Sequence, residues 1–424
     1  MLNYIYLSCF LAVTYARVHH LIVGNLVSPA SLYVLEFDDE SLDLRIVSNN
    51  SAHSPHAWIT FGKQTKEFIY GASLNSPTIA RYKLTTDSGN SSTLQLRLTG
   101  SAVNCGGQTS AFVLAGQQPP FDVYSASWPG PQACGAAFPA SARDDDLGGG
   151  PRYTWDYGAS SGIHGLALGA NGTTLYSADL KGNSVWTHRF VGAAAIDGGG
   201  GVGGGGGIEE VGRLFARDES GPRHLVVHPA GRYLHVIMET ANELVTYELD
   251  GDAREPRREA SVFSVIPEAH SPRPTVNPRT RALLGLNSTS YWAAEVALSP
   301  SGRYLWASTR AHAASEVGYL SMFELDADGA VVPAGRPGSG AGPWGKGPLF
   351  IVPTTTPGGI ANSVSPAPWS DEFVAMTDFR TGYVQIWKMT TKKMDGAMDK
   401  VGAAAVARVD IPDGGCCANV IWYD

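Results

Sequence analysis

Three segments of the chain repeat one pattern, and this repeat strongly limits how the chain can fold. In each, a short apolar strand ends in a Gly-containing turn and a second strand follows at once: residues 164–179 (HGLALGANGTTLYSAD), 223–239 (RHLVVHPAGRYLHVIME) and 294–310 (AEVALSPSGRYLWASTR). Looser copies bring the number of matching strand positions to seven: Ile22, Ile69, Val113, Leu175, Leu234, Leu305 and Val374. Small β units repeated in this way predict an all-β fold, a seven-bladed β-propeller of four-stranded antiparallel blades.

The composition agrees with a β protein that contains many turns. The 424 residues include 50 Gly and 26 Pro, with 10% aromatic and only 17% charged residues. A hydrophobic content of 43% is enough for a large core. The net charge of −8 argues against nucleic acid as the main partner. No internal apolar run is long enough to span a bilayer as a helix, so we expect no membrane span.

The N-terminus predicts a secretory signal peptide over residues 1–16, followed by the propeller over residues 17–424. The segment MLNYIYLSCFLAVTYA has no charged side chain and ends in Thr-Tyr-Ala, as a cleavage site requires. The alternative is a first β-strand of the fold. Asn-x-Ser/Thr sequons begin at Asn49, Asn90, Asn171 and Asn287. Together these features predict a glycoprotein that is secreted or held in the cell wall; a cytoplasmic location is the alternative.

The cysteines predict one disulfide bond. Cleavage after Ala16 would leave Cys105, Cys134, Cys416 and Cys417. Cys105 and Cys134 flank a Pro- and Gly-rich loop and are the expected pair, whereas adjacent cysteines do not easily pair with each other. A zinc site is not expected, because the chain has no CxxC and no His near either pair.

A Gly-rich segment, residues 193–208, interrupts the repeats. It contains GGGGVGGGGG but lacks the Lys-Ser/Thr of a phosphate-binding loop. We interpret it as a flexible insert between blades.

The repeat also predicts where a ligand would bind. Consecutive strands of a blade are antiparallel, so the start of the first and the end of the second lie on one rim beside the central channel. These positions carry polar residues in four repeats: His164 with Asp179, Arg223 with Glu239, Asn362 with Asp378, and Arg310. Any one of them could cap a strand or join two blades. Taken together they favour a ligand site, since convergent polar groups in a pocket are typical of one.

Other histidines are weaker candidates. His224 and His228 would lie roughly 13 Å apart along a strand, too far to share a metal ion. His53 and His56 precede Trp58 at the start of a blade and could reach the rim. The sequence predicts no metal site.

Longer motifs carry a family resemblance. They are HHLIVG with FDDESL after it, GIHG, LYSADL, WTHR, PRHLVVHP, ASTRAH, SVSPAPWSDE and NVIWYD. With these motifs the chain resembles the eukaryotic 3-carboxy-cis,cis-muconate lactonising enzymes (carboxymuconate cyclases) of the seven-bladed-propeller lactonase family, over nearly all of residues 18–424. The family's proposed active-site residues correspond to His164, Arg223, Glu239 and Arg310.

The chain also departs from the family pattern at two places. The family has a His where this chain has Ile360. Its Tyr-Arg-Ala-Asp run is replaced here by Tyr291, Trp292, Ala293 and Ala294, so that an Arg and an Asp are lost.

The resemblance implies a cofactor-free intramolecular lyase (isomerase) reaction. One carboxylate of 3-carboxy-cis,cis-muconate, or of a related small anionic substrate, adds to an alkene carbon and gives a γ-lactone. Arg223 and Arg310 suit carboxylate binding, because a guanidinium can donate two parallel hydrogen bonds, and Asn362 is a further candidate for substrate binding. His164 is the preferred proton donor, with Glu239 orienting it or binding an Arg.

Two other functions remain open. The first is a propeller lactonase that hydrolyses a sugar or aryl lactone. The second is a secreted or cell-wall glycoprotein that binds ligands without turnover. The signal-like segment, the sequons and the departures at Trp292 and Ile360 favour the second. The quartet of His164, Arg223, Glu239 and Arg310 favours catalysis.

Overall fold

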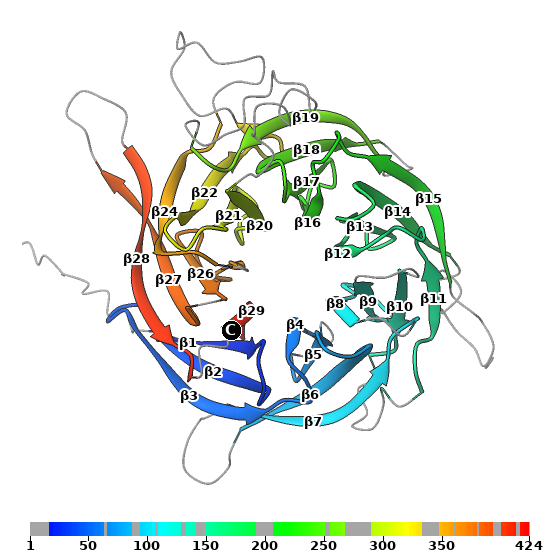
Figure 1. Ribbon diagram of the computed structural model, residues 1–424, viewed down its shortest axis with the longest axis horizontal. Helices are drawn as coiled ribbons and strands as arrows, with labels where there is room; N and C mark the ends of the chain where they lie inside the picture. The colour runs from blue at the N-terminus through cyan, green and yellow to red at the C-terminus, as the bar shows by residue number, and fades with distance from the viewer. Residues whose placement is uncertain are drawn as a thin grey trace, which may run out of the picture.

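A computed structural model describes most of residues 17–423, and every regular element in that part is a β-strand. The gaps are at 63–65, 87–93, 107–108, 129–132, 141–146, 148, 192–206, 251–254, 268–289, 333–346, 360–361, 380, 393–399 and 413–415. The strands form seven antiparallel sheets arranged as blades around a central channel (Figure 1). Over the described residues no helix is long and apolar enough to cross a membrane.

The first four blades are numbered in chain order, and their strands are given from the channel outwards. Blade 1 consists of β29 (Cys416–Trp422), β1 (Val18–Asn25), β2 (Ser31–Asp38) and β3 (Asp43–Ser51). Blade 2 consists of β4 (His56–Phe61), β5 (Phe68–Ser73), β6 (Thr78–Thr86) and β7 (Leu94–Val103). Blade 3 consists of β8 (Thr109–Ala115), β9 (Val123–Trp128), β10 (Cys134–Phe138) and β11 (Tyr153–Asp156). Blade 4 consists of β12 (Ile163–Leu168), β13 (Thr174–Asp179), β14 (Ser184–Val191) and β15 (Gly207–Phe215).

The last three blades complete the ring. Blade 5 consists of β16 (Pro222–Val227), β17 (Tyr233–Met238), β18 (Glu243–Leu249) and β19 (Pro256–Ser264). Blade 6 consists of β20 (Tyr291–Leu298), β21 (Tyr304–Ala311), β22 (Val317–Leu325), β23 (Val331–Val332) and β24 (Phe350–Pro357). Blade 7 consists of β25 (Val364–Pro366), β26 (Phe373–Asp378), β27 (Tyr383–Lys392) and β28 (Lys400–Asp410).

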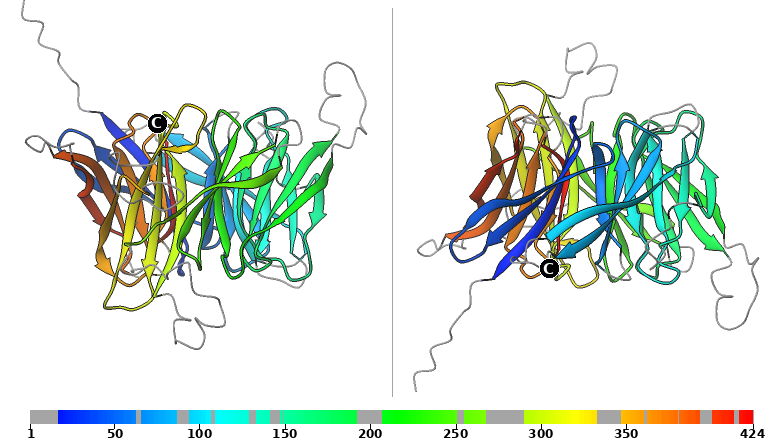
Figure 2. Two further views of the ribbon diagram at one scale, coloured as in Figure 1. Left: turned by 90° about the horizontal axis from the view of Figure 1, so that it is seen from above. Right: turned by 90° about the horizontal axis from the view of Figure 1, so that it is seen from below.

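The position of a strand within its blade follows from its hydrophobic pattern. Every residue of β5 (FIYGAS) is buried, because this strand is covered on both faces by neighbouring blades. The outermost strand of the same blade, β7, instead begins with alternating buried and exposed residues (LQLR), as expected where one face meets solvent. Seen from the side, the outer strands lie oblique to the inner ones, which is the usual twist of a sheet (Figure 2).

The hydrophobic core is divided among the contacts between blades. Each junction between neighbouring blades holds one main cluster of buried side chains. The cluster between blades 1 and 7, for example, joins Leu21 and Phe37 to Phe373 and Ile386. The blades therefore stabilise one another in sequence around the ring, and their inner ends are held in fixed positions.

The two ends of the chain close the ring together in blade 1. The C-terminal strand β29 is the innermost strand of this blade and pairs with β1, with Leu21 opposite Trp422 and Val23 opposite Val420. On its other side, Asn419 of β29 exchanges hydrogen bonds with the backbone of Ile59 in blade 2, at 2.8 and 2.9 Å. Closure therefore joins residues from opposite ends of the sequence.

The predicted fold is confirmed, with two differences in detail. Each of the seven repeat positions lies in a different blade, but Val113 lies in an innermost strand (β8) whereas the others lie one strand further out. Blade 6 has a fifth strand, because β22 pairs with both β23 and β24.

The predicted disulfide is also present. Cys105 and Cys134 are bonded, with their Cα atoms 5.8 Å apart, and both belong to the hydrophobic cluster between blades 2 and 3. Cys416 and Cys417 are the first two residues of β29. The predicted signal peptide, residues 1–16, lies outside the described residues. So does the predicted Gly-rich insert, except for its last two residues, Gly207 and Ile208, which begin strand β15.

Candidate active site

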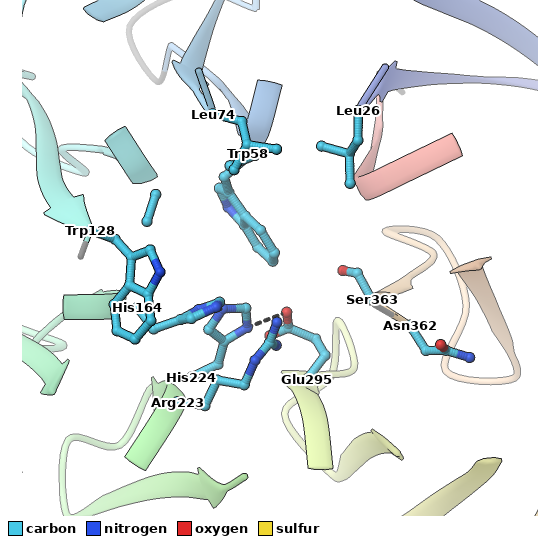
Figure 3. A pocket seen from close by; sticks show the side chains of 12 residues that line it. Leu26, Trp58, Leu74, Trp128, His164, Arg223, His224, Glu295, Asn362 and Ser363 are labelled. Carbon is cyan, nitrogen blue, oxygen red and sulfur yellow. Dashed lines mark hydrogen bonds and ion pairs between the residues drawn. The ribbon is translucent and has the colours of Figure 1, made fainter. Parts of the chain in front are cut away.

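A cavity of about 150 Å³ lies where the inner strands converge, and all seven blades contribute to its wall (Figure 3). A single water molecule needs only about 10–15 Å³ of such space, so the cavity is large enough for a small organic molecule. Its lining residues are Leu26, Ala57, Trp58, Leu74, Ala111, Trp128, His164, Arg223, His224, Glu295, Asn362 and Ser363.

A repeated β-bulge places side chains in this wall. In five blades the innermost strand carries one extra residue relative to its neighbour: Ala57, Ala111, His164, Arg223 and Ala294. A bulge leaves its extra residue unpaired and redirects the side chain, which is why bulges are frequent beside active sites. Four of these five residues line the cavity, and only His164 and Arg223 among them are ionisable.

The residue after each bulge also contributes. In blades 2, 5 and 6 these residues are Trp58, His224 and Glu295, and all three line the cavity. In blade 4 the equivalent residue is Gly165. A Cβ there would lie 2.7 Å from the Arg223 carbonyl oxygen and 2.9 Å from a ring carbon of His224. The glycine therefore makes room for His224 to pack against blade 4.

The polar half of the cavity contains a row of three side chains from three blades. His164 Nδ1 lies 2.9 Å from His224 Nε2, and His224 Nδ1 in turn contacts the Glu295 carboxyl at Oε2. Glu295 Oε1 accepts a hydrogen bond from the Val296 amide at 3.1 Å. His224 and Glu295 are buried, whereas His164 opens in part onto the cavity.

Behind this row, two guanidinium groups share one carboxylate oxygen. Arg223 Nε and Arg310 Nη2 each lie 2.9 Å from Glu239 Oε2, and Arg223 also donates to the Ala294 carbonyl. The side chains of Arg223 and Arg310 are only 9% and 5% exposed, so their charges are poorly screened by water. Two positive charges against one negative charge leave this cluster with an excess of +1.

Burial and these charges determine the protonation states. Burial, and then the positive charge of Arg223, hold the pKa of both His164 and His224 well below the usual value, so both rings are neutral at pH 7. Burial raises the pKa of Glu295 to about 8 although Arg223 acts in the opposite direction, so this carboxyl is mainly protonated at neutral pH. Burial lowers the pKa of Arg310 to about 9, which still leaves it charged at pH 7.

The other half of the cavity is aromatic and aliphatic. Trp58 stacks on Phe112 with ring centroids 4.6 Å apart and meets the His224 ring edge to face at 4.9 Å. The Trp128 and His164 rings also meet edge to face, with their centroids 5.5 Å apart. The cavity therefore offers flat apolar surfaces opposite hydrogen-bond donors, which suits a planar unsaturated molecule that carries an anionic group.

The five residues predicted for the site are brought together, but not all of them line the cavity. His164, Arg223 and Asn362 are in its wall, whereas Glu239 and Arg310 lie outside the lining and are joined to Arg223 through the shared carboxylate. Asn362 is fully buried, and neither of its amide atoms has a hydrogen-bond partner among the described residues. The roles assigned to these residues stay predictions.

Two acids that were grouped with the site by the repeat have other surroundings. The Asp179 carboxylate accepts hydrogen bonds from the Gly162 and Gly182 amides and from the Trp186 indole, so it supports the blade rather than the cavity. Asp378 is likewise buried and accepts a hydrogen bond from the Thr381 amide.

Sequence reasoning missed His224, Glu295 and the two tryptophans of the wall. The sequence spacing argues only against a metal ion shared by His224 and His228, and the His228 ring nitrogen lies 3.2 Å from the Gly302 carbonyl oxygen. Among the described residues no cluster of three or more His, Cys, Asp or Glu side chains could hold a metal ion. A comparison of the residues that follow each bulge is the signal that could have singled out His224 and Glu295.

The remaining candidates lie away from the cavity wall. His56 is buried beneath Gly71 and contacts the Tyr82 hydroxyl at 2.6 Å, and His53 is exposed. Trp292, one of the departures from the family pattern, packs its ring 5.1 Å from the Arg310 guanidinium. Ile360, the other departure, lies outside the described residues.

Comparison with known proteins shows which family this chain belongs to. The family described as "Lactonase, 7-bladed beta-propeller" matches residues 20–337. Carboxy-cis,cis-muconate cyclase of Neurospora crassa is 31% identical over 410 residues, which cover 96% of this chain and 99% of that protein. The periplasmic gluconolactonase of Pseudomonas aeruginosa superposes with a TM-score of 0.67 over 96% of this chain and 99% of its own, but at 15% identity this likeness shows the fold alone.

Proposed function

Because this chain belongs to the seven-bladed β-propeller lactonase family and is a homologue of carboxymuconate cyclase, we propose that it lactonises 3-carboxy-cis,cis-muconate or a closely related polycarboxylate. The observation that carries the proposal is the excess positive charge beside a cavity with aromatic walls. An unsaturated polycarboxylate has both the planar apolar part and the negative charge that such a cavity would bind.

The substrate supplies its own nucleophile in this reaction. One carboxylate must be held over the alkene carbon that it attacks, and holding reactants in this way accounts for much of a rate enhancement. Arg223 is the guanidinium in the cavity wall and would hold a carboxylate. Its partner Glu239 is shared with Arg310, so Arg223 keeps part of its charge for the substrate.

Attack on the alkene leaves negative charge on the neighbouring carbon, which must receive a proton. His164 lines the cavity and is the side chain placed to donate it. Since its ring is neutral at pH 7, it would donate from an N–H and would need its proton replaced. General acid catalysis of this kind is worth about 10²–10⁴ in rate.

An absorbance assay tests the proposal. Purified protein is incubated with 3-carboxy-cis,cis-muconate while the absorbance of the conjugated diene is followed. We expect the absorbance to fall, and we expect His164→Ala to slow the reaction at least about 10²-fold. The matched control is His53→Ala, which changes an exposed histidine and should retain activity. No loss of absorbance at high protein concentration, with the β fold verified by circular dichroism, would overturn the proposal.

We also propose that the protein is secreted and glycosylated. The support is the signal-like segment, the disulfide, and two sequon asparagines, Asn49 and Asn171, whose side chains are exposed. Protein produced by its native secretion route should begin near Arg17 and lose mass on treatment with an N-glycosidase. A product that retains residues 1–16 and carries no glycan would contradict this proposal.

A further inference from the structure

We propose that Glu295, His224 and His164 form a proton relay, in which Glu295 supplies the proton that His164 gives to the substrate. The inference rests on the lactonisation proposed above and adds two residues to it. Glu295 and His224 act through His164 and are therefore positioning and relay groups, whereas His164 is the group expected to touch the substrate.

The relay is a continuous chain across three blades. Glu295 of blade 6 contacts His224 Nδ1 in blade 5, and His224 Nε2 lies 2.9 Å from His164 Nδ1 in blade 4. Both ring nitrogens of His224 are thereby used. Of the four ring nitrogens of His164 and His224, only Nε2 of His164 makes no hydrogen bond within the described part of the chain. His164 lines the cavity. The chain of contacts thus begins at a buried acid and ends at the substrate site.

The surrounding groups favour one arrangement of protons. Arg223 and Arg310 place positive charge near both imidazoles, and Trp58 and Phe112 present their rings to His224. Charged imidazolium is disfavoured in these surroundings. The neutral arrangement has Glu295 O–H donating to His224 Nδ1, His224 Nε2–H donating to His164 Nδ1, and His164 Nε2–H directed to the cavity.

Other groups near Glu295 would stabilise its ionised form once the proton has left. The Val296 amide donates to Oε1 at 3.1 Å, and the Ser363 hydroxyl and the Arg223 guanidinium both favour the carboxylate. Glu239 is held by Arg223 and Arg310 and lies outside the cavity wall. Glu295 can therefore hold a proton before the reaction and bear a negative charge during it.

The proton balance of the reaction closes with this chain. A substrate carboxylate oxygen forms a bond to the alkene carbon, and the π electron pair moves to the adjacent carbon. That carbon takes the proton from His164 Nε2, His164 Nδ1 takes one from His224 Nε2, and His224 Nδ1 takes one from Glu295. The lactone has then gained one proton, Glu295 is a carboxylate, and both imidazoles carry their proton on Nδ1. After the product leaves, a solvent proton enters at His164 Nε2, His164 Nδ1–H returns a proton to His224 Nε2, and His224 Nδ1–H returns one to Glu295, which restores the starting arrangement.

A buried acid at this position would be costly in a purely structural wall. The equivalent residues of blades 2 and 3 are Trp58 and Phe112, which fill the same place with apolar rings. Burying a carboxyl and two imidazoles requires each to be hydrogen-bonded, and apolar side chains would avoid that cost. The relay gives a chemical reason for the three residues.

The decisive variant is Glu295→Gln, because an amide N–H can keep the hydrogen bond to His224 but cannot supply a proton. We expect kcat to fall about 10²-fold while KM changes less than about threefold. The wild-type kcat should decline as pH rises through about 8, where Glu295 loses its proton, and the variant should lack that decline. Glu295→Asp should recover part of the rate. The double variant Glu295→Gln/His224→Gln should be no slower than the slower single variant.

The matched control is Glu324→Gln in β22 of the same blade. Its carboxylate pairs with Arg303 on the outside of the blade, 2.8 Å away. This variant should keep the wild-type kcat and pH profile. Circular dichroism of each variant shows whether the fold is retained.

The outcomes separate the relay from the proposed function. If the wild type turns over and Glu295→Gln keeps both its kcat and its decline near pH 8, the relay is refuted and lactonisation stands. If the wild type does not turn over, lactonisation is refuted and NMR decides the relay. A protonated Glu295 carboxyl and Nε2–H tautomers of His164 and His224 at pH 7 would support it, whereas an ionised Glu295 beside an imidazolium His224 would refute it.

Discussion

Replacing Arg223 by Met removes one of the two guanidinium groups that share the Glu239 carboxylate. In the proposed reaction Arg223 holds a substrate carboxylate through as many as two charge-assisted hydrogen bonds, each worth about 1.5–3 kcal/mol. Losing two such bonds costs about 3–6 kcal/mol in the transition state, a loss of about 10²–10⁴-fold in kcat/KM. We therefore expect Arg223→Met to be nearly inactive.

The same substitution should affect stability little. The variant loses the hydrogen bond to the Ala294 carbonyl, but Glu239 keeps its ion pair with Arg310 at 2.9 Å. No buried charge is left without a partner, so we expect the free energy of unfolding to fall by only about 1–2 kcal/mol. For a chain of this length, that corresponds to a decrease in Tm of about 1–2 °C.

In contrast to Arg223→Met, Glu239→Gln should lower the stability of the fold substantially. It leaves the guanidinium groups of Arg223 and Arg310 buried without a carboxylate between them. Removing one partner of a buried ion pair typically costs about 3–5 kcal/mol. Glu239 is 14% exposed, so we expect the lower end of that range and a decrease in Tm of about 3–4 °C.

Diene absorbance measures the activity and thermal unfolding by circular dichroism measures the stability. If Arg223→Met retains kcat/KM within threefold of wild type, then Arg223 does not bind the substrate carboxylate. If Glu239→Gln unfolds at the wild-type temperature, then the two guanidiniums do not depend on Glu239 and the charge argument is wrong.

Three further predictions follow from local structure. In Gly165→Ala the new Cβ would lie within about 3 Å of backbone atoms of Arg223 and His224, so His224 would have to move. This variant should lower kcat at least about tenfold without changing any ionisable group. Cys105→Ser/Cys134→Ser should lose about 3–4 kcal/mol of stability, since the disulfide spans 29 residues, and a thermal melt with and without reductant checks this. Burial raises the pKa of Glu295 from 4.5 to about 8, so the protonated carboxyl stabilises the folded state at low pH. As the pH rises from about 5 to 8, the wild type should therefore lose stability relative to Glu295→Gln. The difference in Tm between the two proteins measures this loss.

Each of these predictions has a result that would contradict it. Gly149→Ala is the control for Gly165→Ala, because a Cβ at Gly149 meets no atom within 4 Å; equal kcat in the two variants would show that Gly165 does not position His224. A melting curve unchanged by reductant would mean that the disulfide contributes little to the stability of the fold. A constant Tm difference between wild type and Glu295→Gln across pH 5–8 would mean that Glu295 is not protonated in the fold.

The fold was largely predictable because a propeller repeats its hydrophobic pattern in every blade. Strand pairs such as those around Leu175, Leu234 and Leu305 are local, so the sequence shows them directly. The pairing of β1 with β29 could not be seen in the same way. It joins residues such as Leu21 and Trp422, and no local pattern indicates which distant strand will be the neighbour.

The site was predicted in part for a similar reason. His164, Arg223 and Asn362 lie at the ends of strands, which the repeat identifies, and they reach the cavity. His224 and Glu295 each follow a bulge, and their partners are 60 and 71 residues away on other blades. A reading of one blade at a time cannot show such contacts.

The closure of the ring by β29 has a consequence for how the protein is made. At a synthesis rate of about 5–20 residues per second, the roughly 390 residues between β1 and β29 take about 20–80 s to appear. During that time the inner edge of β1 has no strand to pair with, and an unpaired edge can bind other chains. Blades 2 to 7 can form as the chain emerges, but blade 1 stays incomplete, and the newly made protein prone to aggregation, until the seven-residue strand β29 has been released and docked.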